Sequence, residues 1–431
     1  MPTRALSGAR LVRDLGVTNE FLNNNLATTG KIQQVNSDRF LGKNLGSGTG
    51  NTDQVQPWYD VQVPDWTTGQ HTAQWSTLQY YLSSVAQTND LVPASAFYVE
   101  KFGSFPGVGA HATAVVAPNG LIYMPASNNS VGRIINPNNN TVTTYGSFFP
   151  AVNAAIHGGA LTTNGLIYCT PYNQSTASIT NPSNNTTTTF GSFPGAASGW
   201  GAGTILAPNG KVYMIPFNGT VFAVVDPLAN NPTSVQFFGS VPSGSVRSGV
   251  LAPNGKIYCG SSSITFGFIV DPNTNTLSSY GPIPNQIYQG GTILAPSGKI
   301  YMIPTGNTGN SIVVVLDPET NSVVKTFSGI TGNGTQGYAG SVIDSAGRIF
   351  LVPYDATTGL VIDTNNDSIY RYGDATFFPG SQAYEGAIVA PNGNIYFVPY
   401  SATSGLRINT LNNNNWNLNV VTNPFFNRTN P

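Results

Sequence analysis

Few side chains of this protein could perform acid–base, nucleophilic or metal chemistry. The three histidines, His71, His111 and His157, match no metal-binding spacing. Glycoside hydrolysis needs two carboxylates about 5–9.5 Å apart, and most acidic residues here, such as Asp226, fall where turns are expected. Glu385 lies in an apolar, strand-like segment, but no second carboxylate matches it. We therefore predict that the protein is not an enzyme and holds no metal or cofactor.

Two further motifs have a structural explanation. Cys169 and Cys259 occupy equivalent apolar segments, and we expect both to be free, buried thiols. The run from Asp363 to Asp367 has the D-x-N-x-D spacing of a calcium loop, but it lacks the glycine and the distant glutamate of an EF-hand. Asp and Asn are common turn formers, so we interpret this run as a turn.

A short repeated phrase defines the elements that must position any site. LAPNGKIY (251–258) recurs in nearly the same form at 206–213 and 294–301. Its glycine, which we call the anchor glycine, recurs with spacings of 45, 45, 45, 43, 49 and 46 residues, at Gly120, Gly165, Gly210, Gly255, Gly298, Gly347 and Gly393. A period of this length is typical of β-propeller blades.

Each repeat contains four short apolar segments separated by turn residues. The first three segments of one repeat are GAGTILA (201–207), KVYMIP (211–216) and FAVVDP (222–227). The Asn-Gly pair between the first two segments predicts a type I′ hairpin turn. We therefore predict an all-β fold, in which residues 96–431 form a seven-bladed β-propeller of four-stranded antiparallel blades.

The first strand of each blade is expected to line the central channel. Seven residues before the anchor glycine the residue is always small, as at Gly158 and Ser248, which suits crowding near the axis. Two alternatives exist for closing the ring. The segment FYVEKFGSF (97–105) either joins the last blade or packs as an extra strand, in which case WNLNVV (416–421) completes that blade.

Positions at which the repeats differ are candidates for ligand binding. Residues eight to ten before the anchor glycine vary between blades and are expected at the channel mouth: His111, His157, Trp200, Arg247, Gln289, Tyr338, Tyr384 and Glu385. Aromatic and amide side chains in a neutral concave surface suit stacking on sugars and hydrogen bonding to their hydroxyls. The alternative interpretation is that these side chains only fill the channel.

Composition narrows the function further. Charged residues make up 8% of the chain and the net charge is −1, which excludes the basic surface that nucleic acids or anionic membranes require. No apolar run is long enough for membrane insertion. Residues 1–95 do not repeat, and the apolar spacing within 70–87 predicts a helix. We predict that residues 1–95 form an extended, partly helical arm.

One segment of this arm resembles a known family. SDRFLGKNLGSGTGNTDQV (37–55) is similar to a segment of bacteriophage tail-fibre and related virion proteins, in which an apolar-Leu-Gly-Arg/Lys stretch precedes a Gly/Ser-rich run. The matching residues include Arg39, Leu41, Gly42 and Lys43, whereas residues 50–54 depart from the pair of glutamates that is common there. The resemblance implies that residues 1–95 attach the protein to other virion proteins, with Arg39, Leu41, Gly42 and Lys43 taking part. It also implies a displayed domain that binds host-surface glycans.

We therefore expect a virion structural protein, such as a phage tail or capsid fibre, spike or decoration subunit, located in the virion. One alternative is a secreted or cell-surface lectin-like propeller, although the first residues lack the apolar run of a signal peptide. Another is a glycan-active enzyme built on the propeller. Homo-oligomerisation stays open, because no heptad run specifies it.

Overall fold

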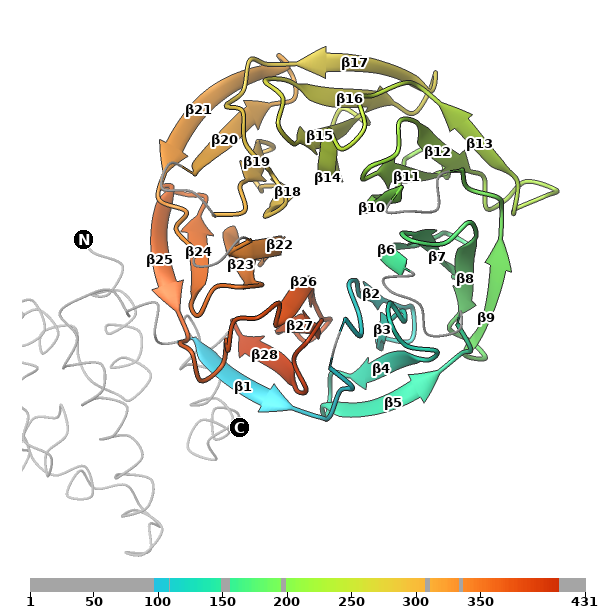
Figure 1. The fold of residues 1–431 in the computed structure, drawn as a ribbon, viewed down its shortest axis with the longest axis vertical. Coiled ribbons are helices and arrows are strands. Elements are labelled where there is room, and N and C mark those ends of the chain that lie inside the picture. Colours follow the sequence, from blue (N-terminus) through green and yellow to red (C-terminus); the bar gives the residue numbers. More distant parts are fainter. Residues whose placement is uncertain are drawn as a thin grey trace, which may run out of the picture. The chain divides into compact units, whose positions relative to one another are not determined.

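The computed structural model describes residues 97–107, 109–148, 156–194, 199–306, 311–332 and 336–410. These residues form seven four-stranded antiparallel sheets, which follow one another around a central axis (Figure 1). The prediction of an all-β, seven-bladed propeller is confirmed. The helix predicted within 70–87 and the segment 416–421 lie outside the described residues. The described residues contain no helix long and apolar enough to cross a membrane.

Each blade has the same strand order, from the innermost strand outward. Blade 1 contains β2 (Val115–Val116), β3 (Ile122–Met124), β4 (Gly132–Asn136) and β5 (Thr141–Tyr145). Blade 2 contains β6 (Ile156–Leu161), β7 (Ile167–Pro171), β8 (Ala177–Asn181) and β9 (Thr186–Phe190). Blade 3 contains β10 (Trp200–Leu206), β11 (Val212–Pro216), β12 (Phe222–Val225) and β13 (Val235–Phe238). Blade 4 contains β14 (Val246–Leu251), β15 (Ile257–Ser261), β16 (Gly267–Asp271) and β17 (Thr276–Tyr280).

The remaining three blades complete the ring. Blade 5 contains β18 (Gly291–Leu294), β19 (Ile300–Ile303), β20 (Ile312–Asp317) and β21 (Ser322–Ser328). Blade 6 contains β22 (Tyr338–Ile343), β23 (Arg348–Pro353), β24 (Gly359–Asp363) and β25 (Ser368–Tyr372). Blade 7 contains β26 (Tyr384–Val389), β27 (Ile395–Pro399), β28 (Gly405–Asn409) and, as its outer strand, β1 (Tyr98–Phe102).

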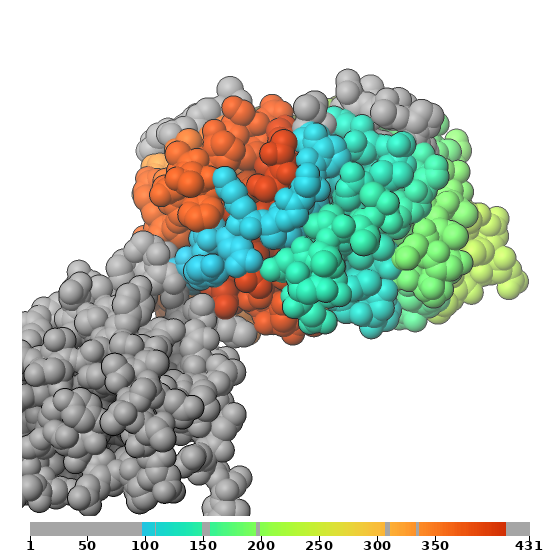
Figure 2. All heavy atoms as spheres, turned by 90° about the horizontal axis from the view of Figure 1, so that it is seen from below, coloured from blue at the N-terminus to red at the C-terminus, as the bar shows by residue number. Residues whose placement is uncertain are grey.

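Strand β1 therefore closes the ring. It pairs antiparallel with β28, so that Tyr98 lies opposite Asn409 and Phe102 opposite Gly405. Figure 2 shows this blue segment lying between the red last blade and the teal first blade. The first of the two closure alternatives is correct. Mixing an early strand with three late ones leaves no unpaired edge on β28.

The hairpin turn at the anchor glycine corrects one prediction. In blade 1, Gly120 N donates to Ala117 O at 2.9 Å and Ala117 N donates to Leu121 O at 2.9 Å, which closes a three-residue loop. Gly120 has a φ of 77°, whereas Asn119 does not have a positive φ. The type I′ prediction is wrong, because the loop has three residues and only the last of them, the anchor glycine, has a positive φ. The loop is instead a type I turn followed by a left-handed glycine.

The small residues near the axis are required by close packing. A Cβ on Gly158 would lie 2.5 Å from Thr204 Oγ1 in the next blade, and one on Gly340 would lie 3.1 Å from the Cα of Gly386. Larger side chains here would push the innermost strands apart. The prediction that only small residues fit at this position is confirmed.

The repeated tyrosine three residues after the anchor glycine connects neighbouring blades. The Tyr213 hydroxyl lies 2.9 Å from Pro272 O and 2.7 Å from Asn275 Oδ1, both in the turn between the third and fourth strands of the next blade. Asn209 Nδ2 also donates to Pro272 O at 2.7 Å. We call this contact the tyrosine lock, and the tyrosines that make it are Tyr123, Tyr168, Tyr213, Tyr258, Tyr301 and Tyr396.

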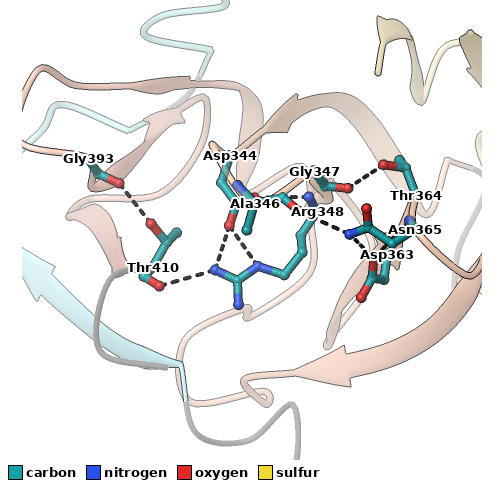
Figure 3. Close-up of polar contacts among 9 residues, drawn as sticks. All are labelled: Asp344, Ala346, Gly347, Arg348, Asp363, Thr364, Asn365, Gly393 and Thr410. Atoms are coloured by element: carbon teal, nitrogen blue, oxygen red, sulfur yellow. Dashed lines mark hydrogen bonds and ion pairs between the residues drawn. The ribbon is translucent and has the colours of Figure 1, made fainter. Parts of the chain in front are cut away.

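Blade 6 replaces the tyrosine lock by an ion pair (Figure 3). Phe350 stands where the other blades have tyrosine. Arg348 forms an ion pair with buried Asp344 at 2.5 Å and donates from Nη2 to Thr410 O of blade 7 at 3.1 Å. The blade therefore keeps a polar connection to its neighbour with different residues.

The motifs with a structural interpretation behave as expected. Cys169 and Cys259 are free and buried, and burial raises the pKa of Cys169 to about 12. Asp363 Oδ1 accepts a hydrogen bond from Asn365 N at 3.0 Å within its turn. Asp367 Oδ1 accepts the Tyr301 hydroxyl at 2.6 Å, so this carboxylate belongs to a tyrosine lock.

Candidate functional site

The two ends of the central channel carry different side chains. The hairpin turns with the anchor glycines lie at one end, which we call the hairpin end. The opposite end, which we call the mouth, is where first strands begin and second strands finish. First strands bring His157 (β6), Arg247 (β14) and Glu385 (β26) to the mouth. Residues directly beyond second strands are Tyr172, Phe217, Tyr354 and Tyr400.

These seven residues, the mouth cluster, include a continuous series of contacts across blades 7, 2, 3 and 4. Glu385 Oε1 lies 3.6 Å from His157 Nδ1. The His157 ring stacks on Tyr172, with ring centroids 3.9 Å apart and planes 10° apart. Tyr172 meets Phe217 edge-on at 5.4 Å, and the guanidinium of Arg247 lies 4.1 Å from the centre of the Phe217 ring.

Two further tyrosines continue the cluster beyond Glu385. The rings of Tyr354 and Tyr400 lie 5.7 Å apart in a tilted arrangement. Burial, followed by the neighbouring Glu385 carboxyl, raises the pKa of Tyr400 to about 12 and also raises the pKa of Tyr354. Both side chains are half-buried. The cluster therefore presents partly accessible aromatic rings from blades 6, 7, 2 and 3.

Small residues allow blades 7 and 2 to meet across blade 1. The blade 1 equivalents of Glu385 and Tyr172 are Ala112 and Ser127, which leave space between the neighbouring blades. Gly201 supplies a second opening, because a Cβ there would lie 2.8 Å from both His157 Cβ and Tyr172 Cδ2. Its φ of +116° is also a conformation that other residues rarely adopt.

Burial sets the charge state of the central pair. It raises the pKa of Glu385 to about 8 and lowers the pKa of His157 to about 3. At neutral pH the carboxyl is therefore mainly protonated and the imidazole is neutral, so the pair is not an ion pair. The Glu385 side chain keeps 17% of its exposure and that of His157 keeps 11%. Burial also lowers the pKa of Arg247, which donates hydrogen bonds to Phe217 O and Val246 O.

Three residues predicted at the mouth lie inside blades instead. Trp200, Tyr338 and Tyr384 are each 1% exposed or less, and their polar atoms bond within the blades. Trp200 Nε1 donates to Pro194 O at 3.3 Å and the Tyr384 hydroxyl donates to Ser404 O at 3.3 Å. We leave these three residues out of the mouth cluster.

His111 and Gln289 take no part in the contacts described for the cluster. His111 is fully buried, its Nδ1 lies 3.0 Å from Pro125 O, and burial lowers its pKa to about 4. Gln289 is half-buried, and its backbone oxygen accepts a hydrogen bond from Gly340 N at 3.0 Å. Of the eight predicted residues, the structure therefore brings together His157, Arg247 and Glu385.

The four aromatic members were not predicted from the sequence, although a signal was present. They all stand seven residues after the anchor glycine, a position that varies between blades: Ser127, Tyr172, Phe217, Ser262, Thr305, Tyr354 and Tyr400. The predicted attachment residues, Arg39, Leu41, Gly42 and Lys43, lie outside the described residues. Within the described ranges, no group of three or more His, Cys, Asp or Glu side chains is placed to hold a metal ion.

Comparison with known proteins supports the fold alone. No protein-family model and no curated protein matches the sequence. Similar solved structures include a catalytically inactive virginiamycin B lyase from Staphylococcus aureus with quinupristin, which is 12% identical with a TM-score of 0.60 over 72% of this chain and 99% of that one. The WD40 propeller domain of Doa1 is 10% identical, with a TM-score of 0.55 over 73% and 97%. The extracellular domain of a hybrid two-component system from B. thetaiotaomicron is 8% identical, with a TM-score of 0.53 over 72% of this chain and 42% of that one.

Proposed function

We propose that this protein is a virion structural protein whose propeller binds a host-surface glycan at the mouth. The observation that carries the binding half is the mouth cluster, in which Tyr172, Tyr354 and Tyr400 offer half-buried rings beside polar side chains. Sugars present flat apolar faces to such rings and hydroxyls to polar neighbours. The low charge of the chain, at 8% of residues, suits a glycan, which is recognised mainly through its hydroxyls and apolar faces.

The virion half rests on the resemblance of residues 37–55 to tail-fibre segments. The arm of residues 1–95 would attach the protein to other virion proteins, and the propeller would be displayed outward. A protein made for display also has no need of a catalytic site. A second carboxylate, Asp355, directly follows Tyr354 of the mouth cluster. It accepts hydrogen bonds from Gln336 N and Gln382 N, which is a structural role.

Glycan binding is tested with the full-length protein on a glycan array. Tyr172→Ala and Tyr400→Ala should each lower binding about tenfold or more, because each removes a stacking surface. Tyr98→Ala is the matched control, since Tyr98 is 56% exposed on the outer strand β1. Equal binding by the wild type and both mouth variants would refute the mouth as the binding site.

Virion attachment is tested by electron microscopy and protein analysis of purified particles. Deletion of residues 1–95 should abolish incorporation, and Leu41→Asp with Lys43→Glu should reduce it. A deletion variant that incorporates as well as the full-length protein would leave a free lectin-like propeller as the better proposal.

A further inference from the structure

The Glu385 carboxyl lacks a close charge partner in the mouth cluster. Its Oε1 lies 3.6 Å from His157 Nδ1, which is too far for a strong hydrogen bond. The imidazole is neutral and therefore cannot balance a carboxylate. Its Nε2 atom is buried without a hydrogen-bond partner among the described residues. Removing a carboxyl from water costs free energy unless a partner, such as a bound ligand, forms a hydrogen bond or ion pair with it.

The Glu385 side chain lies on an innermost strand and is partly exposed. Glu385 belongs to β26, the innermost strand of blade 7 (Figure 1), and its side chain keeps 17% of its exposure. A ligand that enters the mouth can therefore reach the carboxyl oxygens. The cation of the mouth cluster, Arg247, lies at the other end of the series of contacts, over the Phe217 ring.

Aromatic rings surround the same position. Glu385 acts electrostatically on both Tyr354 and Tyr400, and Tyr172 acts on those two tyrosines in turn. Tyr172 is also held in place by its stacking on His157. Tyrosine rings attract cations through their negative faces, and a carboxylate among such rings adds a direct counter-charge. A neutral sugar can only hydrogen-bond to this carboxylate, whereas a cationic group is also attracted by its charge.

We propose that Glu385, with Tyr172, Tyr354 and Tyr400, binds an ammonium group carried by the glycan. The group is either the free amine of an amino sugar or a quaternary ammonium substituent. The inference rests on the proposed function only in taking the carrier to be a glycan. On binding, the cation favours the ionised carboxylate, so Glu385 loses its proton to solvent as the ligand enters.

The experiment measures binding to the full-length protein by calorimetry at pH 6.5, where a large share of amino-sugar amines carry a proton and Glu385 is still protonated before the ligand binds. The probes are a chitosan tetrasaccharide with free amines, its fully N-acetylated counterpart, and tetramethylammonium chloride. The variants are Glu385→Gln and, as a matched control, Asp271→Asn, which changes a carboxylate at the hairpin end. Tetramethylammonium separates recognition of a quaternary group from recognition of an amine that donates hydrogen bonds.

We expect the wild type and Asp271→Asn to bind the free-amine sugar about tenfold more tightly than the acetylated one. Glu385→Gln should reduce this preference to less than about twofold, through a loss of affinity for the free-amine sugar. Equal affinity of the wild type for both sugars, or a preference that survives in Glu385→Gln, would overturn the ammonium site and leave glycan binding standing. Binding of tetramethylammonium alone, lost in Glu385→Gln, would support the site and count against glycan as the carrier. Binding of no probe would overturn the inference.

Discussion

The hairpin end and the mouth are built from the same seven blades, yet their side chains follow opposite rules. At the hairpin end, the anchor glycine, its neighbouring Asn and the lock tyrosine recur in most blades. The Asn and the tyrosine hydrogen-bond to the next blade. At the mouth, positions eight before and seven after the anchor glycine change from blade to blade. Positions that repeat therefore make the contacts that hold neighbouring blades together. Positions that vary form a surface to which only some blades contribute.

The tyrosines at the two ends also differ in how deeply they are buried. Lock tyrosines such as Tyr213 are fully buried, whereas Tyr172 and Tyr400 at the mouth are half-buried. A half-buried ring contributes less to stability and remains available to a ligand. Substitutions at the hairpin end should therefore mainly lower stability, and substitutions at the mouth should mainly lower binding.

The largest effect on stability is expected where the ring closes. Phe102 of β1 is buried against Tyr396, with ring centroids 5.5 Å apart. Phe102→Ala should lower the free energy of unfolding by about 3–5 kcal/mol, because it leaves a cavity at the seam. Denaturant titration measures this. Tyr98→Ala, an exposed change in the same strand, should have little effect, and equal losses for the two variants would argue against β1 as a buried closing strand.

The next effect concerns the ion pair that replaces the tyrosine lock in blade 6. Asp344→Ala should lower the free energy of unfolding by about 3 kcal/mol, since it leaves the mostly buried Arg348 without its carboxylate. Lys256→Ala breaks a more exposed pair with Asp271 at 3.4 Å and should cost less than about 1 kcal/mol. Denaturant midpoints of the two variants would contradict this account if they were the same.

The third effect is smaller and concerns how the free energy of unfolding depends on pH through Glu385 at the mouth. The pKa of Glu385 is raised to about 8 from 4.5 in the unfolded chain, so the protonated carboxyl's contribution to stability is lost as pH rises towards 8. Relative to the wild type, Glu385→Gln should gain roughly 2 kcal/mol in free energy of unfolding between pH 6.5 and pH 8.5. His157 has its pKa lowered from 6.5 to about 3, so its titration lies on the acid side of this window. A difference that does not change with pH would exclude a desolvated carboxyl.

The smallest effect tests a single tyrosine lock. Tyr213→Phe removes the hydroxyl near Pro272 O and Asn275 Oδ1 and should cost about 1 kcal/mol. Tyr172→Phe, at the mouth, should stay within about 0.5 kcal/mol of the wild type. Thermal unfolding of both variants checks the pair. A loss at Tyr172 equal to that at Tyr213 would remove the distinction between the two ends.

Much of the fold was predictable because the repeat is local. The glycine spacing and the four apolar segments per repeat specify blades, and the small residue near the axis follows from crowding. The turn type was predicted wrongly, because the strand register sets a loop of three residues and the Asn-Gly pair alone does not specify that register. Three predicted site residues, Trp200, Tyr338 and Tyr384, are buried inside blades, because neighbouring positions of a strand face different sides and register decides which side is inward.

The sequence by itself determined that there are seven blades, which residues turn between strands, and where charge is scarce, because these properties depend on neighbours along the chain. Only the tertiary structure decided that β1 pairs with β28 and that Glu385 meets His157 across blade 1. These residues are hundreds of positions apart, and ring closure alone brings them together. The desolvation that keeps Glu385 protonated arises from the same closure, since burial depends on every blade that encloses the mouth.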